Sequence, residues 1–352
     1  MNYAHWAGDK MTDKNIKITC WGPRGSLPSP SKKGFSTTEF GGNTSCYHVE
    51  AGPFSVILDC GSGIRDLGNH LMATGKGFGK QFIVPLSHYH WDHIQGLPFC
   101  VPMFIAGNKF YFHGFAPSGH ERGPKPVVEA MLGHQQSNPH FLVAHTELPA
   151  ERLYTDHARQ FSETFWYKYV NSLLGIEKHE KGPGPNDNPK NWIKFTTIPL
   201  NHPDGCLGYK IEYMGKSIVY ATDNEPLRHT NAQLDKHAQL TDWLLLDGQY
   251  SEEQIGGMTQ TFGHGTPAAC IEQAKACLAA LVVIHHHDPA NDDKTLTAME
   301  KATKRDCIRL GYAADGLPGV VEFAREGVVW EIKMTCYFVS GTAKNILRRG
   351  LV

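Results

Sequence analysis

A chain of 352 residues that is 41% hydrophobic and 20% charged carries enough apolar material for a sizeable core, which excludes a wholly disordered protein. Lysine and arginine total 34 against 35 for aspartate and glutamate, so the chain has no bulk positive charge to hold a long polyanion. We therefore expect a globular enzyme for which no long nucleic acid is a partner.

Cysteine usage and hydropathy indicate the compartment. The nine cysteines are spaced singly with no CxxC pair, which is typical of reduced thiols. The first fifteen residues, MNYAHWAGDKMTDKN, lack the apolar core of a signal peptide, and the run CLAALVVI is too short to span a bilayer. We predict a cytoplasmic protein with no membrane partner, in which residues 1–15 form a disordered extension.

The N-terminal part of the chain predicts strands separated by Gly- and Pro-rich loops. NIKITCW is rich in β-branched residues and predicts a strand, and CYHVEAGPFSVILD predicts a hairpin with its turn at Gly52 and Pro53. A short helix is expected over 64–73. QFIVPLS then predicts a buried strand that leads into the histidine-rich stretch SHYHWDH.

Four further apolar runs predict strands, and each ends in residues capable of metal or proton chemistry. They are KFTTIPLNH, KSIVYATD, DWLLLDGQY and LVVIHHHD. Because reactive groups of α/β proteins gather where strands end, we expect these endings to meet SHYHWDH at one site. Thr266 and Pro267 predict the start of a helix that runs to about 280. GVVEFAREGVVWEIKM predicts a late pair of strands.

Residues 108–191 have a different texture, with many Gly, Pro and His and weak periodicity. We interpret this segment as an insertion over or beside the site. Within it, the aromatic stretch ARQFSETFWYKYVNSLLGI, residues 158–176, predicts a helix. Seven histidines here lack partners of the right kind in the sequence and are expected to be ordinary packing or surface residues: His113, His120, His134, His140, His145, His157 and His179.

The stretch SHYHWDH, residues 87–93, predicts two half-sites for metal. His88 and His90 alternate along extended backbone and so point the same way, whereas the turn that follows swings Asp92 and His93 toward a second ion. An accidental cluster among the 20 histidines would not need Asp92 at the turn. Neutral imidazole and carboxylate favour zinc, with manganese or iron as substitutes.

HYHWDH resembles the HxHxDH signature of the metallo-β-lactamase superfamily. The chain is further similar to the phosphodiesterase branch of that superfamily, which includes ribonuclease Z, PhnP-type cyclic phosphodiesterases and cyclic-nucleotide phosphodiesterases. The motifs that carry the resemblance are WGPRGSLPSP, GGNTSCYHVE, ILDCGSGIRDLG, LNHPDGCLGYKIE, YATDNE, LLLDGQY, GHGTP and HHHDP.

The resemblance implies the fold and the domain organisation. We expect an α/β protein, a four-layer αββα metallo-β-lactamase sandwich with an inserted segment. The hydrolase domain covers 16–334, with the insertion at about 108–191, where the resemblance is loose. Residues 335–352 form a C-terminal tail.

The resemblance also implies the metal ligands, which would hold two Zn²⁺ ions, or Mn²⁺ or Fe. They are His88, His90 and His202 around one metal, Asp92, His93 and His286 around the other, and Asp223 bridging both. Taken singly, His202 could be a loop histidine and Asp223 a helix N-cap. The local pattern does not decide which of His285, His286 and His287 is the ligand, because the apolar run before them shows no alternation of polar and apolar side chains. Alignment on the following Asp-Pro favours His286.

A further histidine and an acid point to proton transfer. His264 precedes the helix expected from Pro267, so its imidazole and the free backbone N–H groups of that helix could face a phosphate. Similarity to ribonuclease Z implies that Asp247, at the end of a strand, orients His264. We hypothesise that His264 protonates the leaving alkoxide and that Asp92 is catalytic as well as a ligand. A loop histidine that caps a strand is the alternative for His264.

Three other residues are candidates for supporting roles. Asp59 stands at the end of SVILD, and the resemblance implies that it accepts a hydrogen bond that steadies the HxHxDH loop; a turn residue before Gly61 is the alternative. Arg24 and Arg65 are possible phosphate contacts, with Arg65 better explained as part of a solvated helix face.

These features predict a dinuclear-metal phosphodiesterase that hydrolyses a small phosphodiester, with a cyclic nucleotide as first choice, by a metal-bridging hydroxide. The first alternative is a ribonuclease Z-like or DNA-directed nuclease, which the balanced charge disfavours. A thioester or lactone hydrolase and an inactive binding or sensing protein of the same fold are further alternatives. Related phosphodiesterases are often homodimers, so a homodimer is expected.

Overall fold

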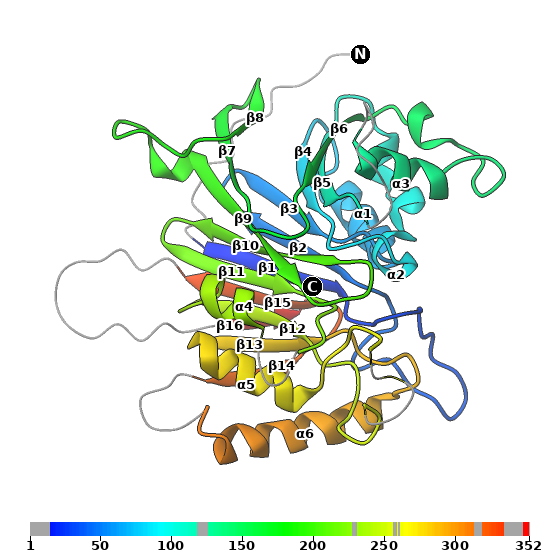
Figure 1. Cartoon of the computed structure of the whole chain (residues 1–352). Helices are drawn as coiled ribbons and strands as arrows, with labels where there is room; N and C mark the ends of the chain where they lie inside the picture. The colour runs from blue at the N-terminus through cyan, green and yellow to red at the C-terminus, as the bar shows by residue number, and fades with distance from the viewer. Residues whose placement is uncertain are drawn as a thin grey trace.

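Two mixed β-sheets lie face to face, and helices cover the outer side of each (Figure 1). The computed structural model describes residues 15–117, 126–226, 231–255, 259, 261–312, 319–333 and 348–351. Within this part of the chain, each sheet has eight strands. Residues 1–14 of the predicted extension, most of the predicted tail and His120 lie outside the described residues.

The strands come from all along the chain. In spatial order the first sheet contains β16 (Arg348–Leu351), β15 (Val328–Lys333), β1 (Asn15–Gly22), β2 (Cys46–Ala51), β3 (Phe54–Leu58), β4 (Gln81–Pro85), β5 (Lys109–Phe115) and β6 (Glu151–His157). The second sheet contains β14 (Val320–Phe323), β13 (Leu281–His285), β12 (Trp243–Asp247), β11 (Lys216–Ala221), β10 (Cys206–Tyr213), β9 (Trp192–Leu200), β7 (Thr164–Asn171) and β8 (Gly175–His179).

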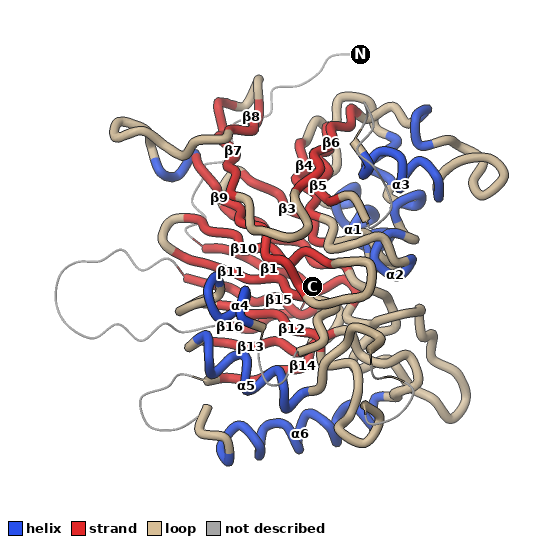
Figure 2. Tube along the Cα trace, viewed as in Figure 1, coloured by secondary structure: helices blue, strands red, loops and turns tan. Residues whose placement is uncertain are grey.

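The helices form the two outer layers, so that the strands occupy the centre of the molecule in Figure 2. The helices on the side of the first sheet are α1 (Ile64–Ala73), α2 (Trp91–Ile94) and α3 (Val127–Gln135). Those on the side of the second sheet are α4 (Ala232–His237), α5 (Pro267–Cys277) and α6 (Asp293–Arg309). Of these, α3 packs on β5 and β6, α5 on β12 and β13, and α6 on β14.

Three apolar clusters separate the four layers. The central cluster joins the facing sides of the two sheets, for example Val49 and Val56 with Phe195 and Trp243. The other two clusters lie between each sheet and its helices. The layer order is therefore helices, sheet, sheet, helices, which is the predicted αββα sandwich.

The apolar strands of the second sheet are buried on both faces, which explains why they lack alternation. In β12, Trp243 and Leu245 face the central cluster, whereas Leu244 and Leu246 face the helices. The hairpin at 52–53, the helix over 64–73 and the helix that starts at Pro267 are confirmed. Thr266 is the N-cap of α5, where its side chain accepts from the Ala269 amide.

The helix predicted over 158–176 is wrong, because that stretch forms the hairpin of β7 and β8. Its aromatic residues alternate in burial: Phe165 and Tyr167 point into the central cluster, and β7 pairs with β9. Aromatic and β-branched side chains fit a pleated sheet well, and here that preference outweighed the weak helical spacing.

The two late strands are confirmed as strands but not as a pair. β14 lies parallel to β13 in the second sheet, whereas β15 is antiparallel to β1 in the first. Each strand carries its own apolar residues into a different sheet, so local pattern gives no indication that they separate. The segment after β14 therefore crosses from one sheet to the other.

Residues 108–191 extend both sheets. Strands β5 and β6 continue the first sheet beside β4, and β7 and β8 continue the second beside β9. The connection between β6 and β7 passes close to the predicted site, since Arg159 donates to the carbonyl of Asp204, two residues after His202. The segment thus adds core strands as well as a loop beside the site.

The cysteines and the helices of the described residues can be compared with the sequence expectations about thiols and membranes. All eight cysteines in this part of the chain are buried free thiols. No helix among the described residues combines the length and the apolar character that crossing a membrane requires.

A buried ion pair between α6 and the segment after β14 is expected to contribute to stability. The Arg325 guanidinium lies 2.7 Å from Glu300 and stacks 4.0 Å from the Phe40 ring centroid. Burial raises the pKa of Glu300, but Arg325 outweighs this and lowers it to about 2. The ordinary pKa of a glutamate is 4.5, so the lowered pKa of Glu300 stabilises the folded state fully above that pH. This stabilisation is lost as the pH falls toward 2.

We expect Glu300→Gln to lower the free energy of unfolding by on the order of 2 kcal/mol at neutral pH, after allowance for partial solvent screening. The difference from the parent chain should shrink below pH 4.5 and nearly vanish near pH 2. Urea unfolding at neutral pH and near pH 2 measures this difference in the free energy of unfolding, and Glu177→Gln, at an exposed residue, is the control. An equal loss at the two pH values would contradict this assignment.

Candidate metal centre

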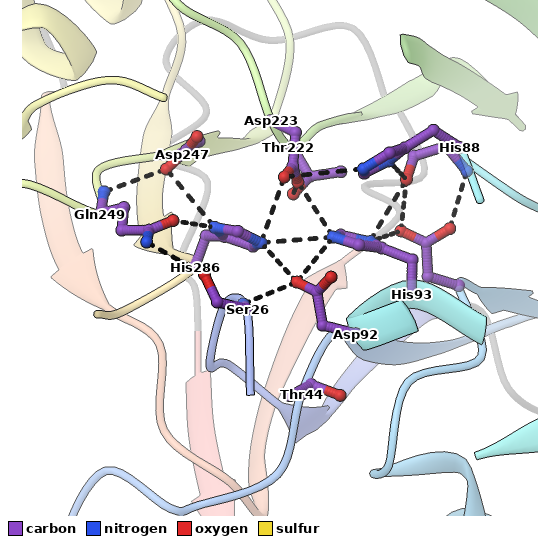
Figure 3. A network of polar contacts seen from close by, with 12 residues as sticks. Ser26, Thr44, His88, Asp92, His93, Thr222, Asp223, Asp247, Gln249 and His286 are labelled. Atoms are coloured by element: carbon purple, nitrogen blue, oxygen red, sulfur yellow. Dashed lines mark hydrogen bonds and ion pairs between the residues drawn. The ribbon is translucent and has the colours of Figure 1, made fainter. Parts of the chain in front are cut away.

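The predicted site residues meet where strands of the two sheets end. SHYHWDH follows β4, Asp247 ends β12, and the other donors lie just after β9, β11 and β13. Figure 3 shows the core of this cluster, with His93 and His286 facing each other between Asp92 and Asp223. The sequence expectation that these strand endings converge matches the structure.

The first donor group consists of His88, His90 and His202, whose ligand atoms lie within 4.8 Å of one another. The Nε2 atoms of His88 and His202 are buried and have no hydrogen-bond partner among the described residues. His202 donates through Nδ1 to the Pro203 carbonyl at 2.8 Å, which leaves the Nε2 lone pair free. Burial lowers the pKa of all three imidazoles and so favours the neutral form that binds metal.

The second donor group consists of Asp92, His93 and His286. Asp92 Oδ2 lies 3.2 Å from His93 Nε2 and 3.0 Å from His286 Nε2, and the two Nε2 atoms are 3.2 Å apart. Neighbouring ligands of a tetrahedral zinc ion with bonds of ~2.0–2.1 Å are separated by about 3.3 Å. The spacing of these three atoms therefore fits a shared cation.

Asp223 lies between the two groups. Its Oδ2 is 3.2 Å from His93 Nε2, and its Oδ1 is 3.2 Å from His286 Nε2 and 3.8 Å from His202 Nε2. Burial opposes the charge, but the surrounding imidazoles hold the pKa of Asp223 well below its usual value. A carboxylate in this place can reach both groups, as a bridging ligand must.

Of the three consecutive histidines, His286 is the one that turns into the cluster. Its backbone has a φ of 61°, in the left-handed region, which reverses the direction expected from β13. His285 is fully buried among Tyr47 and Tyr220, and His287 contacts the Ala324 carbonyl at 3.0 Å. The geometry thus agrees with the choice of His286.

Asp59 contacts the HxHxDH loop in the way that the family resemblance implied. Its carboxylate accepts from the Ser87 amide and hydroxyl, each at 2.7 Å, and from the Tyr220 hydroxyl at 2.6 Å. It also lies 2.7 Å from His93 Nδ1. A carboxylate that accepts from Nδ1 orients the ring and leaves Nε2 for the metal.

Asp247 and His264 form a hydrogen-bonded pair beside the donor groups. Asp247 Oδ2 lies 2.8 Å from His264 Nδ1, and His264 stacks on His286 with ring centroids 4.9 Å apart. Burial lowers the pKa of His264, but the Asp247 carboxylate outweighs it and raises the pKa to about 9. The imidazole lies next to the N-terminus of α5, as the sequence predicted.

The two arginines suggested by the sequence both contact protein groups. The buried Arg24 guanidinium donates to the carbonyls of Gly41, Asp288 and Asn291 and so ties the N-terminal loop to the chain after His286. The exposed Arg65 pairs with Asp66 on α1, in line with a solvated helix face.

Two residues that contact the donor groups are not among the predicted site residues. Gln249 contacts His286, and the Ser26 amide donates to Asp92 Oδ2 at 2.7 Å. Gln249 stands in DGQY two residues after Asp247, so its closeness to a predicted site residue was the available indication. Ser26 lies in a long loop and offered none.

Sequence comparisons find similarity to ribonuclease Z. No family model matches the chain. Ribonuclease Z of Clostridium perfringens is 29% identical over 154 residues, which is 44% of this chain and 40% of that enzyme. Ribonuclease Z of Picrophilus torridus is 23% identical over 310 residues, which cover 83% of this chain and 92% of that enzyme. The chain thus matches less than half of the first relative's length.

Solved structures are similar over most of the chain. YhfI of Bacillus subtilis, a metallo-β-lactamase fold protein, aligns with a TM-score of 0.54 and 17% identity over 90% of this chain and 99% of its own. A diphosphatase of the PhnP family aligns with a TM-score of 0.55 and 16% identity over 89% and 96% of the two chains. Human short-form tRNase Z has a TM-score of 0.51 and 17% identity, and covers 77% of this chain and 93% of its own.

The chain therefore has the metallo-β-lactamase fold, as the sequence predicted. Within that fold it is similar to the phosphodiesterase branch of ribonuclease Z and PhnP-type proteins. These relatives agree with the predicted class, a metal-dependent hydrolase of this fold. The clusters of histidine and aspartate described above are consistent with a two-metal site in this chain.

Proposed function

We propose that this chain is a dinuclear-metal phosphodiesterase that hydrolyses a small phosphodiester, with a cyclic nucleotide as first choice. The observation that carries the proposal is the Asp247–His264 pair, 2.8 Å apart, beside two groups of metal donors between which Asp223 lies. Phosphodiester hydrolysis must place a proton on a leaving alkoxide, and this pair can supply it. A thioester or lactone hydrolase has no obvious use for the arrangement.

The ligand roles follow from the donor groups. His88, His90 and His202 would hold one Zn²⁺, and Asp92, His93 and His286 the other, with Asp223 between them; Mn²⁺ or Fe are the alternative metals. When bound, two such cations lower the pKa of a water molecule that they share and stabilise charge on the attacking and leaving oxygens. The complete donor set disfavours an inactive binding protein.

The remaining steps belong to the side chains of the protein. Asp247 accepts the Nδ1 proton of His264 and so holds the ring with Nε2 available to the substrate. From there His264 contacts the phosphate and protonates the leaving alkoxide. Asp92 lies among the donors of the second group, and we propose that it is catalytic as well as a ligand.

The substrate is proposed to be small because the chain has a net charge of −1, which provides no general attraction for a polynucleotide. A ribonuclease Z-like activity is the second candidate. It is favoured by the similarity to ribonuclease Z of Picrophilus torridus, which covers 92% of that enzyme. The cytoplasmic location and the homodimer stay predictions.

A substrate panel tests the proposal directly. The protein, reconstituted with zinc or manganese, is assayed against cyclic mononucleotides, cyclic dinucleotides and precursor tRNA under the same conditions. We expect turnover of a cyclic nucleotide, with a kcat/KM of at least about 10⁴ M⁻¹s⁻¹ for the natural one. Cleavage of the RNA without turnover of any cyclic nucleotide would favour the second candidate and overturn the first.

A further inference from the structure

Gln249 occupies a position between the second donor group and the N-terminal loop. It follows Asp247 by two residues, and its side chain is buried, with 2% of its surface exposed. Its Oε1 lies 2.8 Å from His286 Nδ1, and its Nε2 donates to Ser26 Oγ at 3.2 Å (Figure 3). The backbone N–H of Gln249 donates to Asp247 Oδ1 at 3.0 Å, and this hydrogen bond fixes the backbone at Gln249.

The contact with His286 selects one tautomer of that ring. A histidine that binds metal through Nε2 must carry its proton on Nδ1, and that proton needs an acceptor. The carboxamide oxygen of Gln249 is such an acceptor, as the Pro203 carbonyl is for His202 and Asp59 for His93. Gln249 thereby leaves the His286 Nε2 lone pair free for a cation that Asp92 and Asp223 would also bind, since their oxygens lie 3.0 and 3.2 Å from this Nε2.

The same side chain closes a ring of contacts around the second donor group. Gln249 reaches Ser26, the Ser26 amide donates to Asp92 Oδ2 at 2.7 Å, and Asp92 Oδ2 lies 3.0 Å from His286 Nε2. Ser26 has a φ of 58°, a costly conformation for a non-glycine residue that aims its amide at Asp92. A Cβ on Gly25 would lie 2.3 Å from His286 Nδ1, so the loop already packs against that ring.

We propose that Gln249 is the positioning residue of His286 and sets the affinity of the Asp92, His93 and His286 group for its cation. The inference rests on the proposed metal centre and names the residue that tunes one half of it. Strand β12 then orients two histidines from one short turn: Asp247 holds His264 for proton transfer, and Gln249 holds His286 for metal. A change at Gln249 should therefore weaken one metal site selectively.

Metal titration of substituted proteins tests the proposal without a substrate. Gln249→Met has nearly the same shape but no acceptor, whereas Gln249→Glu keeps an acceptor for the Nδ1 proton. Gln254→Met is the matched control, because Gln254 lies in the same loop but donates to Asp288, outside the donor groups. Each protein is stripped of metal, and Zn²⁺ affinities are measured by competition with a chelator; bound Co²⁺ is followed by its absorption spectrum.

We expect Gln249→Met to weaken the second cation about 10- to 100-fold and to leave the first unchanged. Gln249→Glu should restore the affinity to within a few-fold of the parent, and Gln254→Met should not alter it. Two equally tight cations in Gln249→Met would overturn the proposal. An equal loss in Gln249→Glu would also overturn it, because packing rather than the acceptor would then matter.

The outcome is separable from that of the proposed function. If the parent chain binds two cations and Gln249→Met loses one, the inference stands even when no phosphodiester in the panel is hydrolysed. If the parent binds fewer than two cations, the inference fails together with the metal centre. Circular dichroism and thermal unfolding of the metal-free proteins verify folding, and should Gln249→Met be unfolded, Gln249→Leu takes its place in the same titration.

Discussion

Replacement of Asp223 by alanine is expected to cut bound cations from two per chain to one or none and to lower kcat/KM by at least about 10³-fold. Asp223 is buried, and its two oxygens lie within 3.2 Å of His93 Nε2 and His286 Nε2 and 3.8 Å of His202 Nε2. Its loss removes the carboxylate that reaches both donor groups, and it leaves the neighbouring imidazoles without their counter-charge.

Metal content by plasma mass spectrometry and hydrolysis of the best substrate from the panel measure this effect. Asp242→Ala is the matched control: Asp242 precedes β12, at the opposite end of that strand from the site, and contacts Lys216 and the Ser217 amide. Asp223→Asn, which keeps the volume, separates loss of folding from loss of metal. Full metal content and turnover in Asp223→Ala would refute the bridging role.

His264→Ala is expected to lower turnover about 10²- to 10⁴-fold while both cations stay bound. The reason is that His264 contacts Asp247 at 2.8 Å and is not one of the seven predicted metal ligands, although its Nδ1 also lies 3.7 Å from Asp223 Oδ1. The loss should depend on the leaving group. A phosphodiester that releases a nitrophenolate needs no proton, so for that substrate the same substitution should cost much less than for a cyclic nucleotide.

Steady-state kinetics on both substrates, with metal content determined in parallel, examine this role. His134→Ala, which changes an exposed histidine of α3, is the control and should leave both rates unchanged. Asp247→Asn should show the same leaving-group dependence in weaker form, because it disturbs the orientation of the ring without removing it. An equal loss with both leaving groups would mean that His264 acts in binding rather than in proton transfer.

Local sequence pattern was sufficient for much of this protein. Turn residues predict the hairpin at 52–53, and a Thr-Pro cap predicts the helix from Pro267. Continuous apolar runs predict the four strands. Local pattern gave a wrong prediction for residues 158–176. Their spacing is weakly helical, but they form β7 and β8 because β7 pairs with β9. Local pattern also could not separate β14 from β15, because each strand obtains its partners from remote parts of the chain.

The sequence by itself determined the chemical character of the site: imidazoles and carboxylates at the ends of strands, in a pattern similar to the phosphodiesterases of the metallo-β-lactamase fold. Only the tertiary structure decided which of three adjacent histidines faces Asp92, and that Gln249 and Ser26 support them. The reason is distance along the chain. His286 and Asp92 are 194 residues apart, so their contact depends on how the two sheets pack and on the left-handed backbone of His286. The residues that neighbour either side chain in the sequence predict neither feature.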